Sequence, residues 1–345
     1  MATMHDSDQS GSGAWSVNPN AARIFAWAIV ALTFAFVINT YLTIWQDFPG
    51  GKVGLALIGL GPEADKDIPG ATLAFGAIQV LIYVLAVVGA IFYVLRTPRA
   101  LRAEAVRMNG IVTYMIRAAF WGVILVGIAD MIISFLRVED LLDDVVGAQL
   151  ATELGRPAFR GGYVHMPLLA LSLVVAAVTR TIGFHWLTLT VVVAELLIVL
   201  SRFIFSYEQA FQGDLVRFWY ASLFLFASAY TLLEDGHVRV DVLYSGFSLR
   251  AKGLANAIGC VLLGLSLTLV VMFFGMEDRT SIITSPLINY EVSQSGFGMY
   301  VKYLMAGFLA IFAVSMTIQF AATLLDSLAD HRGDPGHIDH EGAAT

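Results

Sequence analysis

Four polar side chains interrupt the long apolar stretches of this sequence: Asn39, Gln79, Asp130 and Glu195. Asp130 lies within GVILVGIADMIISFL and Glu195 within LTVVVAELLIVL, so both carboxyl groups are deep in apolar segments. A carboxylate in such surroundings needs a cationic partner or a proton, because an unpaired charge is costly there. Such a group serves as an ion or proton site, or it makes interhelical hydrogen bonds that fix packing. The two carboxyl groups are not clustered, which favours the packing role.

The remaining reactive side chains do not form a recognised catalytic or cofactor-binding pattern. Cys260 is the single cysteine, so it cannot form an intramolecular disulfide or a zinc or iron–sulfur framework. His165 and His185 lie at the ends of apolar stretches, and neither faces a second histidine that would complete a haem site. Phosphate-binding loops, nucleophile elbows and metalloprotease motifs are absent from the sequence. We therefore expect no enzyme activity and no cofactor.

A short polar segment, EDGHVRVD at 234–241, alternates ionic and small apolar residues. In an extended chain His237, Arg239 and Asp241 would share one side. In a helix His237 and Asp241 would share a face at a spacing of four. In both cases Arg239 has the carboxylates of Glu234 and Asp241 close by to neutralise it. A functional loop and a solvated turn both fit this pattern.

The composition places most of the chain in a lipid bilayer. Hydrophobic residues make up 58% of the 345 residues and charged residues only 14%. A soluble chain of this length would need more charge to cover its surface. The net charge of −7 provides no basic surface for nucleic acid. The first apolar stretch is too long for the core of a signal peptide, so we interpret it as a retained membrane span.

Eight stretches approach or exceed the length that crosses a hydrocarbon core as a helix. The predicted spans are 24–46, 73–95, 111–136, 164–179, 185–205, 215–233, 254–276 and 299–325. The fourth is the shortest of them. The sequence therefore predicts an all-α integral membrane protein with about eight transmembrane helices.

The loops between these spans alternate in charge. Basic residues fall in one set of loops, and acidic residues gather in the other set. Basic residues near helix ends favour the cytoplasmic side, so both termini are predicted to lie inside. The inner basic residues are Arg96, Arg99, Arg102, Arg107, Arg180, Arg239, Arg250 and Lys252; the outer acidic ones are Glu63, Asp65, Asp67, Glu139, Asp140, Asp143, Asp144, Glu153, Glu277, Asp278 and Glu291.

The outer segment 138–154 predicts a short amphipathic helix lying at the membrane surface or against a partner. Its predicted apolar face consists of Leu141, Leu142, Val145, Val146 and Leu150. Aromatic side chains near the water–lipid boundary are predicted to set the depth of the protein in the membrane. They include Trp45, Trp186, Trp219, Tyr300 and Tyr303.

The segment 213–253 resembles the signature of the small membrane subunit (DctQ type) of tripartite ATP-independent periplasmic (TRAP) transporters. The GHVRVD sequence at 236–241 matches the inner loop between the second and third helices of that family. Arg202 and the aromatic residues after it match the end of the family's first helix, and Asp214, Arg217 and Trp219 open the next helix. The similarity covers about 185–330. The chain departs from the four-helix family pattern because about four further spans precede this region.

This resemblance implies a division of the chain and a role for it. It implies a polar cytoplasmic tail at 1–21, an N-terminal four-helix membrane extension at 22–184, a small-permease-like four-helix module at 185–329 and a second polar cytoplasmic tail at 330–345. It also implies a scaffold for a separate large transport subunit in the bacterial inner membrane. In the family a periplasmic binding protein captures a solute, often a carboxylate, and the large subunit moves it with a sodium gradient, so sodium coupling is expected there and not in this chain.

The resemblance marks Arg202, Arg217 and the loop from His237 to Asp241 as the groups that contact the partner or brace it. Two other functions fit the residues alone. The first is an autonomous eight-helix ion-coupled transporter or channel that uses Asp130 and Glu195. The second is an anchor for assembly or electron transfer.

Overall fold

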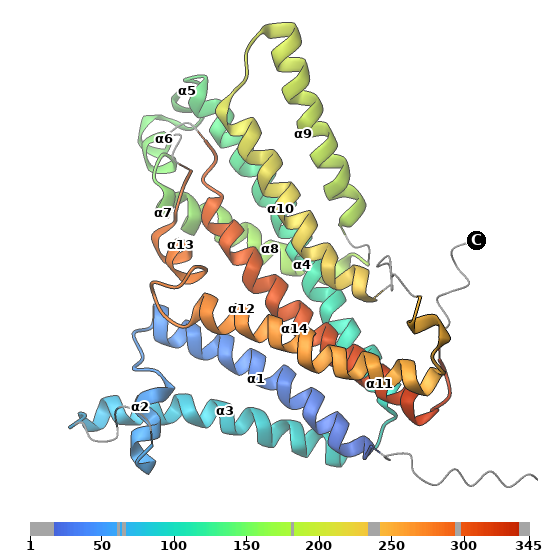
Figure 1. Ribbon diagram of the computed structural model, residues 1–345. Helices are drawn as coiled ribbons and strands as arrows, with labels where there is room; N and C mark the ends of the chain where they lie inside the picture. The colour runs from blue at the N-terminus through green and yellow to red at the C-terminus, as the bar shows by residue number, and fades with distance from the viewer. Residues whose placement is uncertain are drawn as a thin grey trace, which may run out of the picture.

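The computed structural model describes residues 17–60, 63, 67–180, 183–233, 242–293 and 298–337. These residues form helices and connecting loops, with no strand among them. Two helices contain a π-helical segment, at Gly161–His165 and Cys260–Leu265. The α-helices are α1 Pro19–Trp45, α2 Gly51–Leu55, α3 Gly70–Arg96, α4 Leu101–Val138, α5 Leu142–Val146, α6 Ala148–Leu154, α7 Pro157–Arg160, α8 Met166–Val178, α9 Phe184–Phe205, α10 Ala210–Leu233, α11 Leu249–Gly259, α12 Ser266–Met276, α13 Thr284–Asn289 and α14 Lys302–Arg332 (Figure 1).

The predicted count of eight spans is confirmed, since eight helices of the described chain are long and apolar enough to cross a membrane. The fourth span was predicted to be the shortest, but α7, the π-helical segment and α8 form one helix of 22 residues, Pro157–Val178. It begins earlier than the hydropathy indicates because its first turns carry Arg160 and two glycines. Pro157 stands in the first turn, where its missing N–H costs no hydrogen bond.

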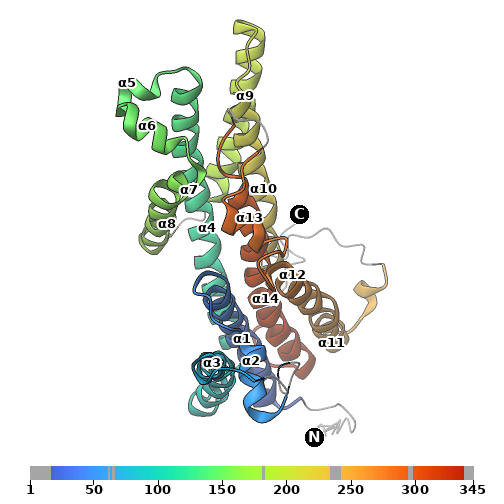
Figure 2. The ribbon, with the colours of Figure 1, turned by 90° about the vertical axis from the view of Figure 1, so that its left-hand side faces the viewer.

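The two longest helices, α4 and α14, lie against each other at the centre of the molecule. Helix α10 packs on both of them, and α9 packs on the outer side of α10. Helix α1 packs on α3 and on α14, whereas α8 packs on α4. The 90° view shows the resulting elongated body, with α4 running along it (Figure 2). The helices on either side of residue 185 therefore belong to one bundle, because α4 contacts both α10 and α14.

Each end of the bundle is held by polar contacts between different helices. At one end the Arg332 guanidinium donates to the Val17 carbonyl at 2.6 Å, and Arg102 pairs with Asp330 at 2.6 Å. The start of α1 and the end of α14 therefore share an end, as an even number of spans requires. At the opposite end Lys52 pairs with Glu277 at 2.9 Å. That end also carries α2, α13 and the helices α5–α7 (Figure 1), and we call it the outer end, following the predicted orientation.

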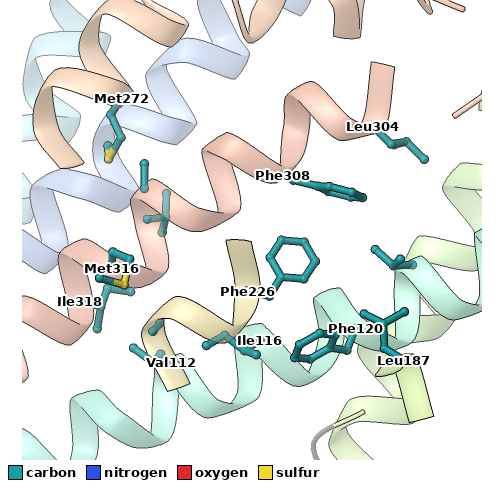
Figure 3. Close-up of a cluster of buried hydrophobic side chains, with 14 of the residues drawn as sticks. Val112, Ile116, Phe120, Leu187, Phe226, Met272, Leu304, Phe308, Met316 and Ile318 are labelled. Atoms are coloured by element: carbon teal, nitrogen blue, oxygen red, sulfur yellow. The ribbon is translucent and has the colours of Figure 1, made fainter. Parts of the chain in front are cut away.

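The apolar core lies between α4, α10 and α14. Phe226 of α10 is its centre, with its ring centroid 5.6 Å from that of Phe120 and 5.1 Å from that of Phe308 (Figure 3). Beyond these aromatics, α4 and α10 approach closely at Gly127, where a Cβ atom would lie 2.3 Å from Nε1 of Trp219. The glycine thus makes room for the indole ring, which donates to the Val123 carbonyl at 3.2 Å.

The prediction of a single amphipathic helix at 138–154 is wrong. The segment forms two short helices, α5 and α6, separated by Gly147, whose φ of 83° breaks the helix. The break turns α6 so that Ala151 and Leu154 join Leu142 in a small buried cluster. Three residues of the predicted apolar face, Leu141, Val145 and Leu150, are exposed instead.

Two of the five aromatic residues that were predicted to set the depth of the protein in the membrane are exposed. Trp45 and Trp186 are exposed at helix ends, whereas Trp219, Tyr300 and Tyr303 are buried, so the prediction is wrong for these three. Each buried ring finds a polar partner inside the chain, which removes its need for the water–lipid boundary. Sequence position near a span end does not distinguish the two cases.

Candidate functional site

Asp130 is at the centre of a fully buried ionic cluster near the outer end of α4. Its Oδ1 atom lies 2.9 Å from Nη1 of Arg160 and 3.1 Å from Nε2 of His165. Its Oδ2 atom accepts from the Tyr300 backbone N–H at 2.8 Å. The side chains of Asp130, Arg160 and His165 are all 0% exposed. Both carboxylate oxygens are therefore occupied by groups of this chain.

The π-helical turn at Gly161–His165 brings Arg160 and His165 to the same carboxylate. In an α-helix, residues five apart point about 140° away from each other. A π-helical turn bonds each residue to the one five positions on, so it places these two side chains nearer to one face. Gly161 opens the turn, and a Cβ atom there would lie 2.4 Å from the Tyr290 ring. The tight packing around Gly161 thus requires a residue without a side chain.

Two tyrosines complete the cluster, Tyr300 just before α14 and Tyr303 in its first turn. The Tyr303 hydroxyl lies 2.8 Å from Nδ1 of His165. The Tyr300 hydroxyl donates to the Gly155 carbonyl at 3.0 Å and accepts from Arg137. The guanidinium of Arg160 lies 4.1 Å from the Tyr300 ring centroid, a distance at which cation–π attraction is strong in a desolvated site.

The hydrogen-bond pattern assigns one consistent set of protons to the cluster. An ionised Asp130 accepts from Arg160 and from Nε2–H of a neutral His165, and Nδ1 of that histidine accepts from the Tyr303 hydroxyl. The charges of Asp130 and Arg160 then cancel. Because the oxygens already have three donors, this cluster is suited to holding helices together, and it does not leave the carboxylate open to a transported ion. Asp130 thus finds the partner that its sequence environment requires.

A second buried ion pair lies at the inner end of the bundle. Arg23 of α1 and Glu104 of α4 are 2.7 Å apart, with side chains 1% and 0% exposed. Oε2 of Glu104 also accepts from Nε1 of Trp27 at 3.2 Å and from the Tyr93 hydroxyl at 3.0 Å. The cluster therefore joins α1, α3 and α4 where the sequence analysis placed a loop.

Asn39 and Gln79 fix the packing of α1 on α3. The Asn39 amide donates to the Gln79 carbonyl at 3.1 Å, and the Gln79 amide donates to the Thr43 hydroxyl at 2.8 Å. The Gln79 amide oxygen accepts from the Gly50 N–H at 2.7 Å, just before α2. Gln79 thus has partners for both side-chain polar atoms, whereas Asn39 pairs through its amide nitrogen and its Oδ1 atom is buried without a partner.

Glu195 differs from the other three. It lies halfway along α9, and its side chain is exposed. Within the described residues no hydrogen bond or ion pair joins it to another part of the chain, so packing inside this chain does not account for it. The structure places Asp130 inside the bundle and Glu195 on its outside, and the two do not form one site.

The residues that flank the α9–α10 turn have different surroundings. Arg202 is exposed and pairs with Glu208 at 2.6 Å. Asp214 accepts from the Met299 N–H at 3.1 Å and from the Ser293 hydroxyl at 3.0 Å, which attaches the start of α10 to the segment before α14. Arg217 is largely exposed, whereas Trp219 is buried against α4 and has a structural role. Glu234, His237, Arg239 and Asp241 lie outside the residues that the structure describes.

Sequence reasoning missed the partners of Asp130. Both lie in RPAFRGGYVH at 156–165, Arg160 in the loop before the predicted fourth span and His165 at the start of that span. The available signal was a cation and an imidazole flanking a glycine pair on the same side of the membrane as Asp130. The tyrosines were missed because their roles depend on α14 packing against α4.

Comparison with known protein families gives a match for one region of the chain. Residues 191–330 match a family model described as "Tripartite ATP-independent periplasmic transporters, DctQ component". No curated protein and no solved structure matches the chain. The matched region begins in α9 and ends in α14, so it covers under half of the chain and leaves α1 to α8 outside.

Proposed function

We infer that this chain, whose residues 191–330 match the model of the DctQ component of TRAP transporters, acts as the small permease subunit of such a transporter. The family is one of transporter subunits and not of enzymes. The match is the observation that carries the inference. The matched range includes the loop at 236–241, on which the resemblance to this family rests.

The proposed task is to scaffold a separate large membrane subunit. That subunit would lie in the inner membrane of a bacterium and receive a small solute bearing a carboxylate group from a periplasmic binding protein. A sodium gradient would then drive the solute across the membrane. A scaffold has to remain rigid while its partner moves. The buried pairs Asp130–Arg160 and Arg23–Glu104 support this role, because each joins helices that are distant in sequence at opposite ends of the bundle.

The N-terminal helices are proposed to enlarge the same scaffold. Helix α4 lies at the centre of the bundle, where it packs on α10 and α14 of the matched region. Tyr303 of α14 and Tyr300, which lies just before α14, complete the Asp130 cluster from that region. The extension is therefore fixed to the family module by buried polar contacts, with α3 packed on α1 and α8 packed on α4.

The autonomous transporter or channel has less support. It requires Asp130 and Glu195 to act together, but one is buried in an ion pair and the other is exposed on α9. We therefore propose the scaffold alone.

The decisive experiment reconstitutes transport from purified parts. This chain is co-expressed with the large membrane protein encoded beside its gene, and the purified complex is placed in proteoliposomes with the cognate binding protein. We expect solute uptake that requires all three proteins and an inward sodium gradient. Uptake by this chain alone, or a large protein that does not co-purify with it, would contradict the proposal.

The loop at 234–241 provides a sharper test of partner contact. Arg239→Ala leaves the carboxylates nearby in sequence without their cation, so we expect weaker co-purification of the large subunit or lower uptake. Arg180→Ala is the matched control, since Arg180 is an exposed arginine in another predicted inner loop. Equal complex yield and equal uptake for both variants would identify the loop as a solvated turn.

A further inference from the structure

A polar stripe runs along one face of α9, the helix that opens the matched region. Thr188, Glu195 and Arg202 follow one another at intervals of seven residues, and all three are exposed. Residues seven apart lie within about 20° of one another around a helix. Val192 and Val199 flank Glu195 on this face and are 58% and 47% exposed. We call these five residues the α9 stripe.

Helix α9 is the least covered of the spans. Only 11% of its most apolar stretch is buried inside the molecule. Its buried residues, Leu187 and Ala194, lie on a face about 80–100° around the helix from Glu195. The α9 stripe therefore lies about a quarter turn away from the face of α9 that packs on this chain.

Glu195 is too deep to reach water. It is halfway along α9, so about 16 Å of helix separates it from either end. An acidic side chain facing lipid at this depth is costly, because acyl chains offer neither a hydrogen-bond donor nor a counter-charge. Arg202 does not neutralise it, since Arg202 is two turns away and already pairs with Glu208. Among the described residues none donates to the Glu195 carboxyl group, so a donor from a partner would satisfy it.

We propose that the α9 stripe is the seam on which one transmembrane helix of the large subunit docks, with a cationic or hydrogen-bond-donating side chain opposite Glu195. This rests on the proposed function and specifies where the partner binds. The seven-residue spacing is the repeat of two helices that pack along a shallow left-handed crossing. Val192 and Val199 supply the small apolar contacts on either side of the polar pair.

A second copy of this chain does not fit the α9 stripe. Two copies inserted in the same direction and related by a twofold axis would bring Glu195 against Glu195 at the middle of the membrane. Two carboxylates at that depth repel each other, or one of them must stay protonated. The charge of the stripe therefore favours a partner of different sequence over a homodimer.

The test places a photo-reactive side chain at single positions of the full chain in the intact membrane. Val192 and Val199 lie in the α9 stripe, and Val193 is the matched control, a valine 44% exposed on another face of α9. We expect cross-links to the large subunit from 192 and 199 and to lipid from 193. Cross-links from 192 and 199 to a second copy of this chain, or to lipid alone, would overturn the proposal.

Substitutions provide a second readout. Glu195→Leu should lower the association constant for the large subunit about 3- to 20-fold, the range of one interhelical polar interaction in a membrane. Glu195→Gln, which keeps hydrogen-bonding capacity, should lose less. Val192→Trp should weaken the complex and Val193→Trp should not, and each variant's yield and melting temperature report folding.

The outcomes separate the two proposals. If the wild-type chain binds the large subunit but Glu195→Leu and Val192→Trp bind it equally well, the seam is wrong and the scaffold function stands. If the wild-type chain binds no large subunit at all, both proposals fail.

Discussion

The ion pair at the centre of the Asp130 cluster can be tested by a double-mutant cycle. Asp130→Asn keeps the shape of the side chain and removes its charge, which leaves the Arg160 guanidinium buried without a counter-charge. Removing one member of a fully buried pair costs about 3–5 kcal/mol. With an unfolding entropy of ~2.1 cal/mol/K per residue for a chain of 345 residues, that loss lowers the melting temperature by about 4–7 °C.

The assay is thermal unfolding of the purified chain in detergent, followed by intrinsic tryptophan fluorescence. Arg160→Met should lower the melting temperature to a similar degree, because it leaves the buried Asp130 carboxylate without its counter-charge. The double variant Asp130→Asn, Arg160→Met should be more stable than either single variant, because it removes both charges together. Asp143→Asn is the control, since Asp143 is exposed on α5 and its change should leave the melting temperature unaltered.

Two results would refute this reasoning. A melting temperature for Asp130→Asn equal to that of the wild type would show that the buried charge of Arg160 is satisfied elsewhere. Additive losses in the double variant would show that the two side chains do not interact energetically.

Two further predictions concern helix packing. Gly127→Ala places a methyl group against the Trp219 indole and should lower the free energy of unfolding by about 1–3 kcal/mol. Gly89→Ala is the control, because the added methyl group meets open space and the change should be neutral or slightly stabilising. Thermal unfolding of the two variants compares these effects. Glu104→Gln leaves the buried Arg23 guanidinium at the inner end without its counter-charge and should destabilise the chain by about 3–5 kcal/mol. Thermal unfolding measures this loss too, and an unchanged melting temperature would contradict the buried pair.

Much of the fold follows from the sequence because a bilayer leaves few alternatives. Backbone polar groups cannot remain unpaired in hydrocarbon, so each long apolar stretch has to be a helix. The number of spans and their approximate ends could be predicted on this basis, and the loop at 236–241 indicated the family. The amphipathic segment at 138–154 was mispredicted because it lies outside the membrane, where a single glycine, Gly147, decides the helix direction.

The sequence could not predict which side of each helix packs inside the bundle and which side is exposed. The core and the surroundings of a membrane bundle are similarly apolar, so α9 shows no contrast between a buried and an exposed side. Asp130 and Glu195 therefore look alike in sequence, each a carboxyl group in an aliphatic run. Packing alone separates them, since α4 lies between other helices and α9 lies at the edge.

The sequence by itself determined that Asp130 needs a partner, since a buried carboxylate without one is too costly at any position. Only the tertiary structure decided which partner it has. Arg160 and His165 reach Asp130 through a π-helical turn, and Tyr300 reaches it through the packing of α14 on α4. These contacts join residues 30 to 170 positions apart. Local sequence patterns do not encode such distances, because helix direction and register are fixed by the packing of the whole bundle.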